Sequence, residues 1–388
     1  MARLRSATRL VLTSVLLATF VFAARADEVG VSSDAILFGQ AAALEGPSSA
    51  LGQRLRYGIV AAFSEINARG GIHGRKLQLI SRDDGYDPDR SVVQTLRLID
   101  EDKVFALIGA VGTPTAMATI PITSSREIPF IGPLSGAALL RDLELTNVVN
   151  VRASYSAESE TLIKHLTEDR HFTRIGIFYQ DDSFGHDGLA GVKAALARRG
   201  LELAVEGTFE RNTRAVSAAW RTIKRAEPEA IIMVGTYGPS AEFIKLAHRS
   251  GAHPTFASIS FVGATALAHE LGAEGDGVVV AQVVPFPWDR SIKLVADYQA
   301  AQRAIDPTLA PDFVSLEGYV SGRLAAAALE KLGPNPTRAA LLRTINDVGR
   351  FDISGSIITV GFRAIETPPK VFLTVIQKDG TFRAVDGL

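Results

Sequence analysis

Short apolar runs alternate with amphipathic stretches along most of the chain. The runs lie at residues 35–43, 76–84, 104–111, 128–133, 174–180, 203–209, 230–235, 255–262 and 278–286. Many of them are continuous rather than alternating, which is typical of strands covered on both faces in parallel sheets. We therefore predict a strand at each of these positions.

The segments between the runs carry helix signals. Residues 51–68 place apolar side chains at steps of three and four, and the two glycines at 70–71 suit the positive φ of a helix end. An Asp-Pro pair at 87–88 and a Thr-Pro pair at 113–114 are typical of helix starts. Repeated strand and helix units predict an α/β fold with doubly wound parallel sheets.

Four loops between these elements are rich in Gly, Ser, Thr and Pro. They lie at residues 45–49, 112–115, 132–136 and 181–185. In open α/β sheets small ligands bind beyond the carboxyl ends of the strands, where loops lead into helices. We therefore expect backbone amides and hydroxyls of these loops to face a small ligand.

The first 26 residues have the pattern of an export signal. Arg3, Arg5 and Arg9 precede an apolar run at 10–24, and a small residue follows at Ala26. The run is shorter than the about 20 apolar residues of a membrane span, and a retained N-terminal anchor is the alternative. The chain has no cysteine, so no lipid anchor is expected, and the mature protein is predicted to start near Asp27 in the periplasm.

Composition narrows the classes of function. Without residues 1–26, which hold four arginines, the chain keeps 362 residues with 37 basic and 42 acidic side chains. A nucleic-acid partner would require clustered basic residues, so none is expected. This length exceeds the about 250–300 residues at which single cores stop growing, so two lobes are expected.

Neither a metal site, nor a cofactor, nor catalysis is predicted. The acids at 82–89 lack the EF-hand spacing, and His248 and His253 lack a zinc motif. The sequence contains no G-x-S-x-G elbow, P-loop, dinucleotide fingerprint or H-E-x-x-H motif. An enzyme stays a remote alternative because such sheets also carry enzymes.

Five segments in order give the chain a recognisable likeness. They lie at 45–92, 106–122, 128–136, 175–192 and 230–247. The series resembles the leucine/isoleucine/valine-binding family of periplasmic solute-binding proteins, which belongs to the type I periplasmic-binding class and supplies ABC importers. The resemblance implies two lobes joined by a three-segment hinge. Lobe one would comprise 27–152 plus 284–365, and lobe two 153–283 plus 366–388.

The resemblance also implies the ligand-binding residues. Thr113 matches a hydroxyl that holds the ligand carboxylate, although it is also placed to cap its helix. Leu134 matches a backbone contact, and Gly136 falls where the family has a second hydroxyl, which neighbouring Ser135 is placed to supply. Phe184 and Tyr237 match aromatic residues of lobe two.

Further positions depart from the family or extend the site. Ser260 falls where the family has an acid for the ligand's ammonium group, and Leu51 falls at a tryptophan. Tyr155 lies just past the first crossover and is another expected cleft residue. Arg152 beside it is placed either to pair with a ligand carboxylate or to tie the hinge to a lobe.

The missing acid leaves two interpretations of the ligand. Either Glu45, Asp181, Asp182 or Glu317 replaces it, or the ligand has no ammonium group. We favour the second and expect a small aromatic or aliphatic carboxylate. Across both interpretations the predicted ligand is a small carboxylate, either an amino acid of the branched-chain type or a related aromatic or aliphatic acid. The predicted function is that of an extracytoplasmic solute-binding component of an ABC importer, with permease subunits in the inner membrane as partners. A periplasmic sensor that signals to a receptor is the alternative.

Overall fold

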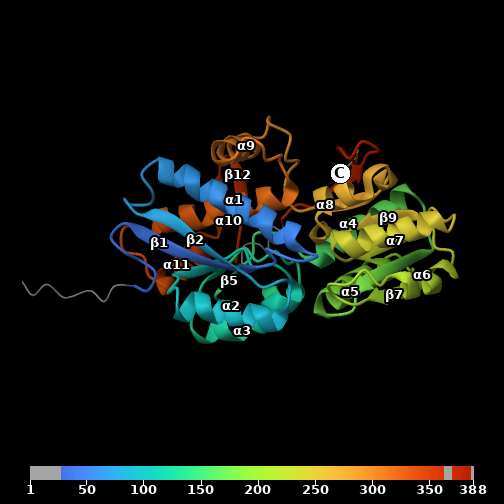
Figure 1. Ribbon diagram of the computed structural model, residues 1–388, viewed down its shortest axis with the longest axis horizontal. Coiled ribbons are helices and arrows are strands. Elements are labelled where there is room, and N and C mark those ends of the chain that lie inside the picture. The colour runs from blue at the N-terminus through green and yellow to red at the C-terminus, as the bar shows by residue number, and fades with distance from the viewer. Residues whose placement is uncertain (1–27, 362–368, 386–388) are drawn as a thin grey trace, which may run out of the picture.

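The computed structural model describes residues 28–361 and 369–385. They form two α/β lobes that lie side by side (Figure 1). The predicted signal peptide at 1–26 and the predicted lobe boundary at 365 lie outside the described residues. Within these described residues, no helix combines the length and apolar character needed to cross a membrane.

The sheet of lobe one is parallel throughout its described strands. Its order is β2-β1-β3-β4-β5. The strands are β1 (Ala35–Ala42), β2 (Lys76–Asp83), β3 (Ala106–Ile108), β4 (Phe130–Ile131) and β5 (Val148–Val149). The first four helical segments are α1 (Ser49–Ala68), α2 (Pro88–Asp100), α3 (Thr113–Ser125) and the 3₁₀ turn Ala138–Arg141.

A second part of lobe one comes from much later in the chain. It comprises α9 (Lys293–Ile305), α10 (Phe313–Leu332), α11 (Arg338–Val348) and the hairpin of β11 (Arg350–Ile353) and β12 (Ser356–Thr359). Helix α10 packs against α1, while α2 and α3 cover the other face of the sheet (Figure 1). The backbones of α1 and α10 approach so closely that a Cβ on Gly58 would lie 1.8 Å from the carbonyl oxygen of Ser315.

The sheet of lobe two is mixed. Among the described residues its order is β14-β13-β10-β9-β8-β6-β7, with β13 and β14 antiparallel to their neighbours at one edge. The strands are β6 (Ile175–Gln180), β7 (Val205–Phe209), β8 (Ala230–Val234), β9 (Thr255–Ser258), β10 (Val279–Gln282), β13 (Phe372–Ile376) and β14 (Phe382–Ala384). The helices are α4 (Tyr155–Lys164), extended by a π-helical turn at His165–Asp169, α5 (Ser183–Ala197), α6 (Ser217–Lys224), α7 (Tyr237–Arg249) and α8 (Ala264–Leu271), with 3₁₀ turns at Ser260–Val262 and Gly272–Gly275.

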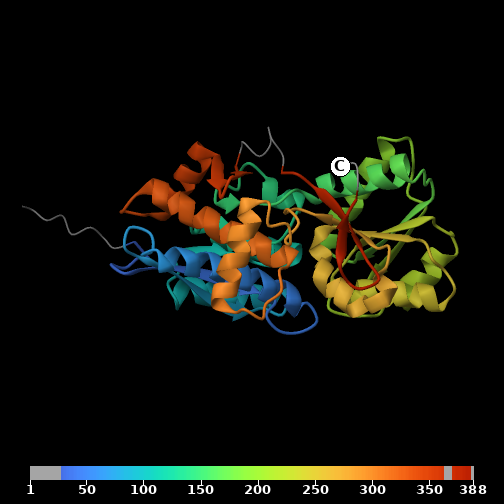
Figure 2. The same ribbon diagram turned by 90° about the horizontal axis from the view of Figure 1, so that it is seen from above.

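The chain passes between the lobes more than once. It leaves lobe one after β5, returns to it between β10 and α9, and leaves it again between β12 and β13. Figure 2 shows the C-terminal strands, in red, lying on the lobe opposite to the orange and red helices that precede them. Each lobe is therefore built from segments that are distant from one another in the sequence.

Local sequence signals explain where several helices begin and end. The Asp87 side chain accepts a hydrogen bond from the amide of Arg90 at 3.0 Å and caps α2, as its position before Pro88 predicts. Gly70 and Gly71 take φ of 102° and 75° after α1. The fully buried strands β6 and β8 each lie between two other strands of the sheet of lobe two, as continuous apolar runs predict.

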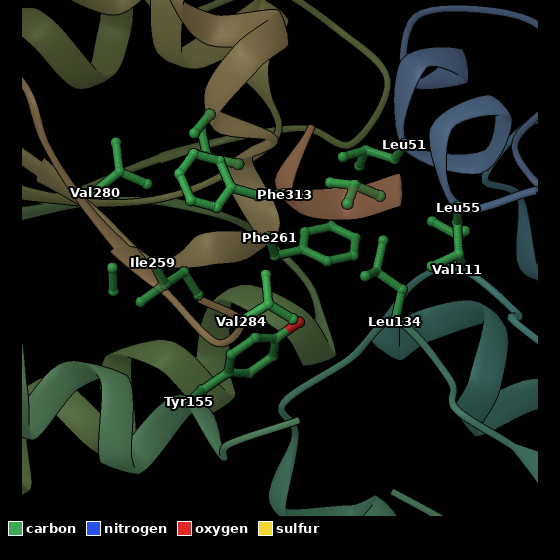
Figure 3. Packing of buried hydrophobic residues seen from close by; sticks show 14 of the residues in the cluster. Leu51, Leu55, Val111, Leu134, Tyr155, Ile259, Phe261, Val280, Val284 and Phe313 are labelled. Atoms are coloured by element: carbon green, nitrogen blue, oxygen red, sulfur yellow. The ribbon is translucent and has the colours of Figure 1, made fainter. Parts of the chain in front are cut away.

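Several predicted strands are shorter in the structure than their apolar runs, and one of these runs also enters another element. The apolar run at 255–262 is a strand only as far as Ser258, and residues 260–262 form a 3₁₀ turn. Gly263 then takes a φ of 75° and redirects the chain into α8. Among the residues after Ser258, the buried Phe261 faces the other lobe and does not lie in a sheet (Figure 3).

Candidate functional site

Two hydroxyl side chains meet at the carboxyl ends of β3 and β4. Thr113 is the first residue of α3, and Ser135 follows β4. Their Oγ atoms lie 2.8 Å apart, and both side chains are fully buried. The N-cap of α3 is Gly112, so the interpretation of Thr113 as the helix cap is wrong. The hydroxyl of Thr113 is instead hydrogen-bonded to Ser135. The amides at this helix start favour a negative charge nearby.

The residues on either side of Ser135 shape the same corner. The amide of Leu134 donates to Ala110 at 2.7 Å, and its carbonyl accepts from Gly112 at 3.1 Å, so both backbone groups are engaged within lobe one. The carbonyl of Gly136 accepts from the amide of Tyr155 at 2.8 Å. A Cβ on Gly136 would lie 2.5 Å from the Tyr155 ring, so the glycine lets this ring approach.

A layer of aromatic rings lies between the lobes. The ring centroids of Tyr155 and Phe184 are 5.3 Å apart, those of Phe184 and Phe261 are 4.6 Å apart, and those of Phe261 and Tyr86 are 5.9 Å apart. All four side chains are buried. Figure 3 shows Phe261 directed from its turn towards Leu134 of lobe one. We call Tyr86, Tyr155, Phe184 and Phe261 the aromatic layer.

A buried charged cluster adjoins this layer. It consists of Arg152 in the first crossover, Glu158 on α4, Ser260 after β9 and Glu317 on α10. Arg152 lies 3.5 Å from a carboxylate oxygen of each glutamate and donates from Nη2 to the hydroxyl of Ser260.

The cluster is linked to both the backbone of lobe two and the aromatic layer. The amide of Ser260 donates to Glu158 at 2.6 Å. The guanidinium carbon of Arg152 lies 5.8 Å from the centroid of the Tyr155 ring.

Burial changes the protonation of the cluster. It raises the pKa of Glu317 to about 7 even though Arg152 opposes this rise. Burial also raises the pKa of Glu158 above its usual range. For Arg152 burial would lower the pKa, but Glu317 and Glu158 raise it overall. The cluster therefore holds a charged arginine between two carboxyl groups, one of which takes up a proton near neutral pH.

Comparison with known proteins identifies the family. Residues 35–371 match the family described as Periplasmic binding protein. The chain belongs to this family. A solved structure of a possible leucine/isoleucine/valine-binding protein from Rhodopirellula baltica is 37% identical, with a TM-score of 0.85, and the match covers 93% of this chain and 98% of that one. A substrate-binding periplasmic protein from Ralstonia solanacearum is 26% identical, with a TM-score of 0.84, over 90% and 100% of the two chains.

Relatives of this periplasmic binding protein include leucine/isoleucine/valine-binding proteins. The protein BraC3 of Rhizobium johnstonii is 24% identical over 357 residues, which cover 90% of this chain and 92% of that one. Homolog 7 of Brucella abortus is 24% identical over 274 residues, which cover 69% and 68%. The family, like the predicted type I fold, is one of binding proteins that work outside the cytoplasm.

Most of the predicted site residues of this periplasmic binding protein come together. The hydroxyl corner, the aromatic layer and the charged cluster contain Thr113, Leu134, Ser135, Gly136, Tyr155, Phe184 and Ser260. Tyr237 lies elsewhere in the interface, where its hydroxyl accepts from the amide of Ala50 at 3.3 Å beside Leu51.

The four acids proposed as replacements at Ser260 have different surroundings. Glu45 and Asp181 are exposed, and Asp182 accepts from Gln180 at 2.7 Å and from the amide of Phe184 at 3.0 Å. Glu317 alone among the four lies in the charged cluster with Arg152.

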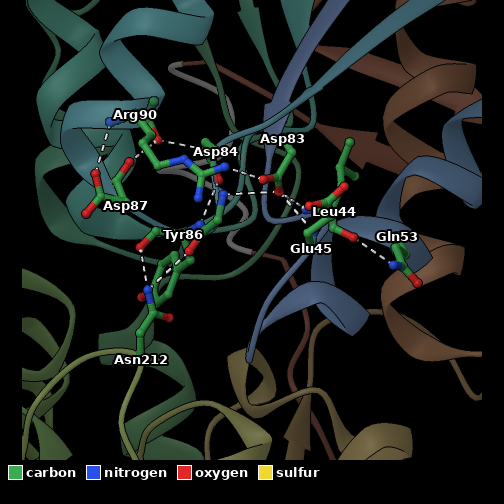
Figure 4. A network of polar contacts seen from close by, with 11 residues as sticks. Leu44, Glu45, Gln53, Asp83, Asp84, Tyr86, Asp87, Arg90 and Asn212 are labelled. Atoms are coloured by element: carbon green, nitrogen blue, oxygen red, sulfur yellow. Dashed lines mark hydrogen bonds and ion pairs between the residues drawn. The ribbon is translucent and has the colours of Figure 1, made fainter.

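Direct hydrogen bonds hold the lobes together around the site. The hydroxyl of Tyr86 accepts from Gln180 at 3.1 Å, and Asn212 donates to the carbonyl of Gly85 at 3.1 Å. Figure 4 shows Asn212 reaching the loop that carries Tyr86, which is fixed in turn by Asp84. The two lobes are therefore in direct contact beside the site.

Tyr86 and Phe261 were not predicted as site residues. Tyr86 follows β2 in the acid-rich loop at 82–89, so the rule about carboxyl ends of strands applies to it as well. It has a positive φ of 59°, which is unusual for a tyrosine and marks a special backbone position. The apolar run at 255–262 predicts a strand at Phe261, and that prediction does not indicate that the side chain points to the other lobe.

In the described ranges 28–361 and 369–385, no group of three or more His, Asp or Glu side chains is arranged to hold a metal ion. The imidazoles of His248 and His253 lie 4.8 Å apart, at the edge of lobe two.

Proposed function

We propose that this periplasmic binding protein is the solute-binding component of an ABC importer and holds a small carboxylate between its lobes. The observation that carries the proposal is the hydroxyl pair of Thr113 and Ser135, which lies at a helix start and next to the aromatic layer. Hydroxyl donors and helix amides suit a carboxylate, while aromatic rings suit an apolar body. The Leu/Ile/Val-binding relatives support this class, because those amino acids also carry a carboxylate.

The proposed ligand has no ammonium group. In the family that this chain resembles, the position of Ser260 carries the acid that pairs with the ammonium. Here the guanidinium of Arg152 donates to the hydroxyl of Ser260. A cation of the protein is thus held where a ligand cation would be expected, and two like charges would repel each other in a buried site.

Binding without catalysis is the proposed mechanism. The two lobes exchange between open and closed arrangements, and a ligand that contacts both stabilises the closed one by its differential affinity. The closed form would then dock on permease subunits in the membrane. We keep 27–152 plus 284–365 and 153–283 plus 366–388 as the proposed lobes. In support, the strands of the five-stranded sheet lie within the first set of ranges and those of the seven-stranded sheet within the second.

The test is a calorimetric titration of residues 27–388 after unfolding and refolding to remove bound ligand. Amine-free aliphatic and aromatic carboxylates are compared with amino acids of the same carbon skeleton. Thr113→Val removes the hydroxyl and keeps the shape, and Thr123→Val is the matched control, since Thr123 is buried on the same helix. A hydrogen bond to a charged group contributes about 1.5–3 kcal/mol, so Thr113→Val should weaken binding about 10- to 100-fold.

Each outcome of the titration tests a different part of the proposal. Binding of amino acids alone would show that another acid replaces the one missing at Ser260. Unchanged affinity in Thr113→Val would show that the carboxylate binds elsewhere. If no carboxylate binds, the proposed ligand class is wrong.

A further inference from the structure

A cavity between the lobes carries unpartnered polar atoms, and we propose that it holds a second acceptor group at the far end of the ligand. The cavity has a volume of about 300 Å³. Leu51 and Arg54 of α1 line it from lobe one, and Tyr237, Gly263 and Thr265 line it from lobe two. This inference rests on the proposed function and narrows the ligand to a dicarboxylate.

The cavity adjoins the aromatic layer. Gly263 follows two residues after Phe261, and a Cβ on Gly263 would lie 2.8 Å from the side chain of Leu51 and 3.7 Å from the ring of Tyr237. Leu51, Phe261 and Tyr237 belong to one buried hydrophobic cluster, part of which Figure 3 shows. In this proposal the apolar spacer of the ligand runs from the aromatic layer along Leu51 and Tyr237 into the cavity.

Arg54 brings a cation without a counter-ion to this cavity. Its Nη1 is buried and has no hydrogen-bond partner, and among the described residues no carboxylate lies within 4.0 Å of its guanidinium. The acids that also line the cavity are engaged elsewhere. Glu270 accepts from Arg214 at 2.6 and 2.9 Å, and Asp312 caps α10 by accepting from the amide of Ser315 at 3.0 Å.

The opposite wall supplies a second unpartnered atom. The Oγ1 of Thr265, near the start of α8, is buried and has no hydrogen-bond partner. A guanidinium N–H can only donate, and a hydroxyl can donate or accept. The group that satisfies both must be an acceptor, and a carboxylate fits because it also neutralises Arg54.

Two acceptor sites at different places in the interface define the ligand class. Thr113 and Ser135 would hold one carboxylate, and Arg54 and Thr265 would hold the other. Because Arg54 and Thr265 come from different lobes, the second carboxylate would also help to hold the lobes closed. The ligand class is therefore an aliphatic or aromatic dicarboxylate.

The test compares linear α,ω-dicarboxylates with monocarboxylates of equal chain length by calorimetric titration of the refolded protein. The variant is Arg54→Met, and Arg56→Met is the matched control, since Arg56 lies on the same helix but is exposed. We expect the best dicarboxylate to bind at least about tenfold more tightly than its monocarboxylate counterpart. Arg54→Met should remove this advantage by weakening dicarboxylates about 10- to 100-fold, with monocarboxylates unchanged. Thr265→Val should act in the same direction but less strongly, and Arg56→Met should change neither series.

The outcomes separate this inference from the proposed function. If monocarboxylates bind and no dicarboxylate binds more tightly than its counterpart, the second acceptor site is wrong while the carboxylate site stands. The same conclusion follows if Arg54→Met weakens both series equally. If neither series binds, the proposed function fails together with this inference. A melting temperature measured for each variant shows that it is folded.

Discussion

Replacing Glu317 by glutamine tests the electrostatics of the charged cluster. Burial raises the pKa of Glu317 from 4.5 to about 7 in the folded protein. Between pH 4.5 and about 7 the unfolded chain releases the Glu317 proton while the folded protein keeps it. The contribution of Glu317 to stability is therefore complete below about pH 4.5 and is lost as the pH rises to about 7. At about 1.4 kcal/mol for each pKa unit, the complete loss is about 3 kcal/mol.

Urea unfolding at about pH 5 and about pH 8 measures most of this effect, about 2–3 kcal/mol. Glu317→Gln cannot ionise, so the decline between the two pH values should be smaller in this variant by that amount. Glu330→Gln on the same helix is the control, since Glu330 is exposed. If Glu317→Gln and the native protein lose the same stability between the two pH values, Glu317 does not keep its proton in the folded state and the reasoning is refuted.

Three further substitutions test the cap, the helix contact and the lobe contact. Asp87→Ala should cost about 1 kcal/mol of unfolding free energy because it removes the cap of α2, whereas Asp89→Ala in the same turn should cost less; equal losses would contradict the cap. Gly58→Ala should cost about 3 kcal/mol or more in urea unfolding, because its Cβ would overlap the backbone of α10. Gly275→Ala, whose Cβ would meet only side chains at 3.2 Å or more, should be much milder, and similar losses would disprove the close approach. Asn212→Asp keeps the shape but removes the donor to the other lobe, so ligand affinity in a titration should fall about fivefold; unchanged affinity would show that this contact does not help closure.

The sequence predicts most of the repeating strand and helix units, but not the short strand β5 or the later strands β11 to β14. Continuous apolar runs and helix-start signals such as Asp87 depend on neighbouring residues, so they can be read without tertiary information. The run at 255–262 shows the limit of this reasoning. An apolar residue that faces another lobe has the same pattern as one that faces a sheet, and Phe261 belongs to the first kind.

The site was predictable only in part for a related reason. Thr113 and Ser135 follow strands, so the topology of the sheet brings them together. Arg152, Ser260 and Glu317 lie more than 50 positions apart from one another, and only the packing of three different segments brings them into contact. The likeness to a family indicated Ser260 as a special position, but not that Arg152 contacts it.

The close packing of α1 on α10 has a consequence for the time at which the protein can fold. Gly58 and Ser315 are 257 positions apart, so the contact between α1 and α10 cannot form until α10 has been synthesised. Contacts between such distant segments form slowly, because a long loop must close before they can form. The core of the first lobe is therefore completed only when the last third of the chain is present, so this lobe cannot finish folding while the earlier part of the chain is being made.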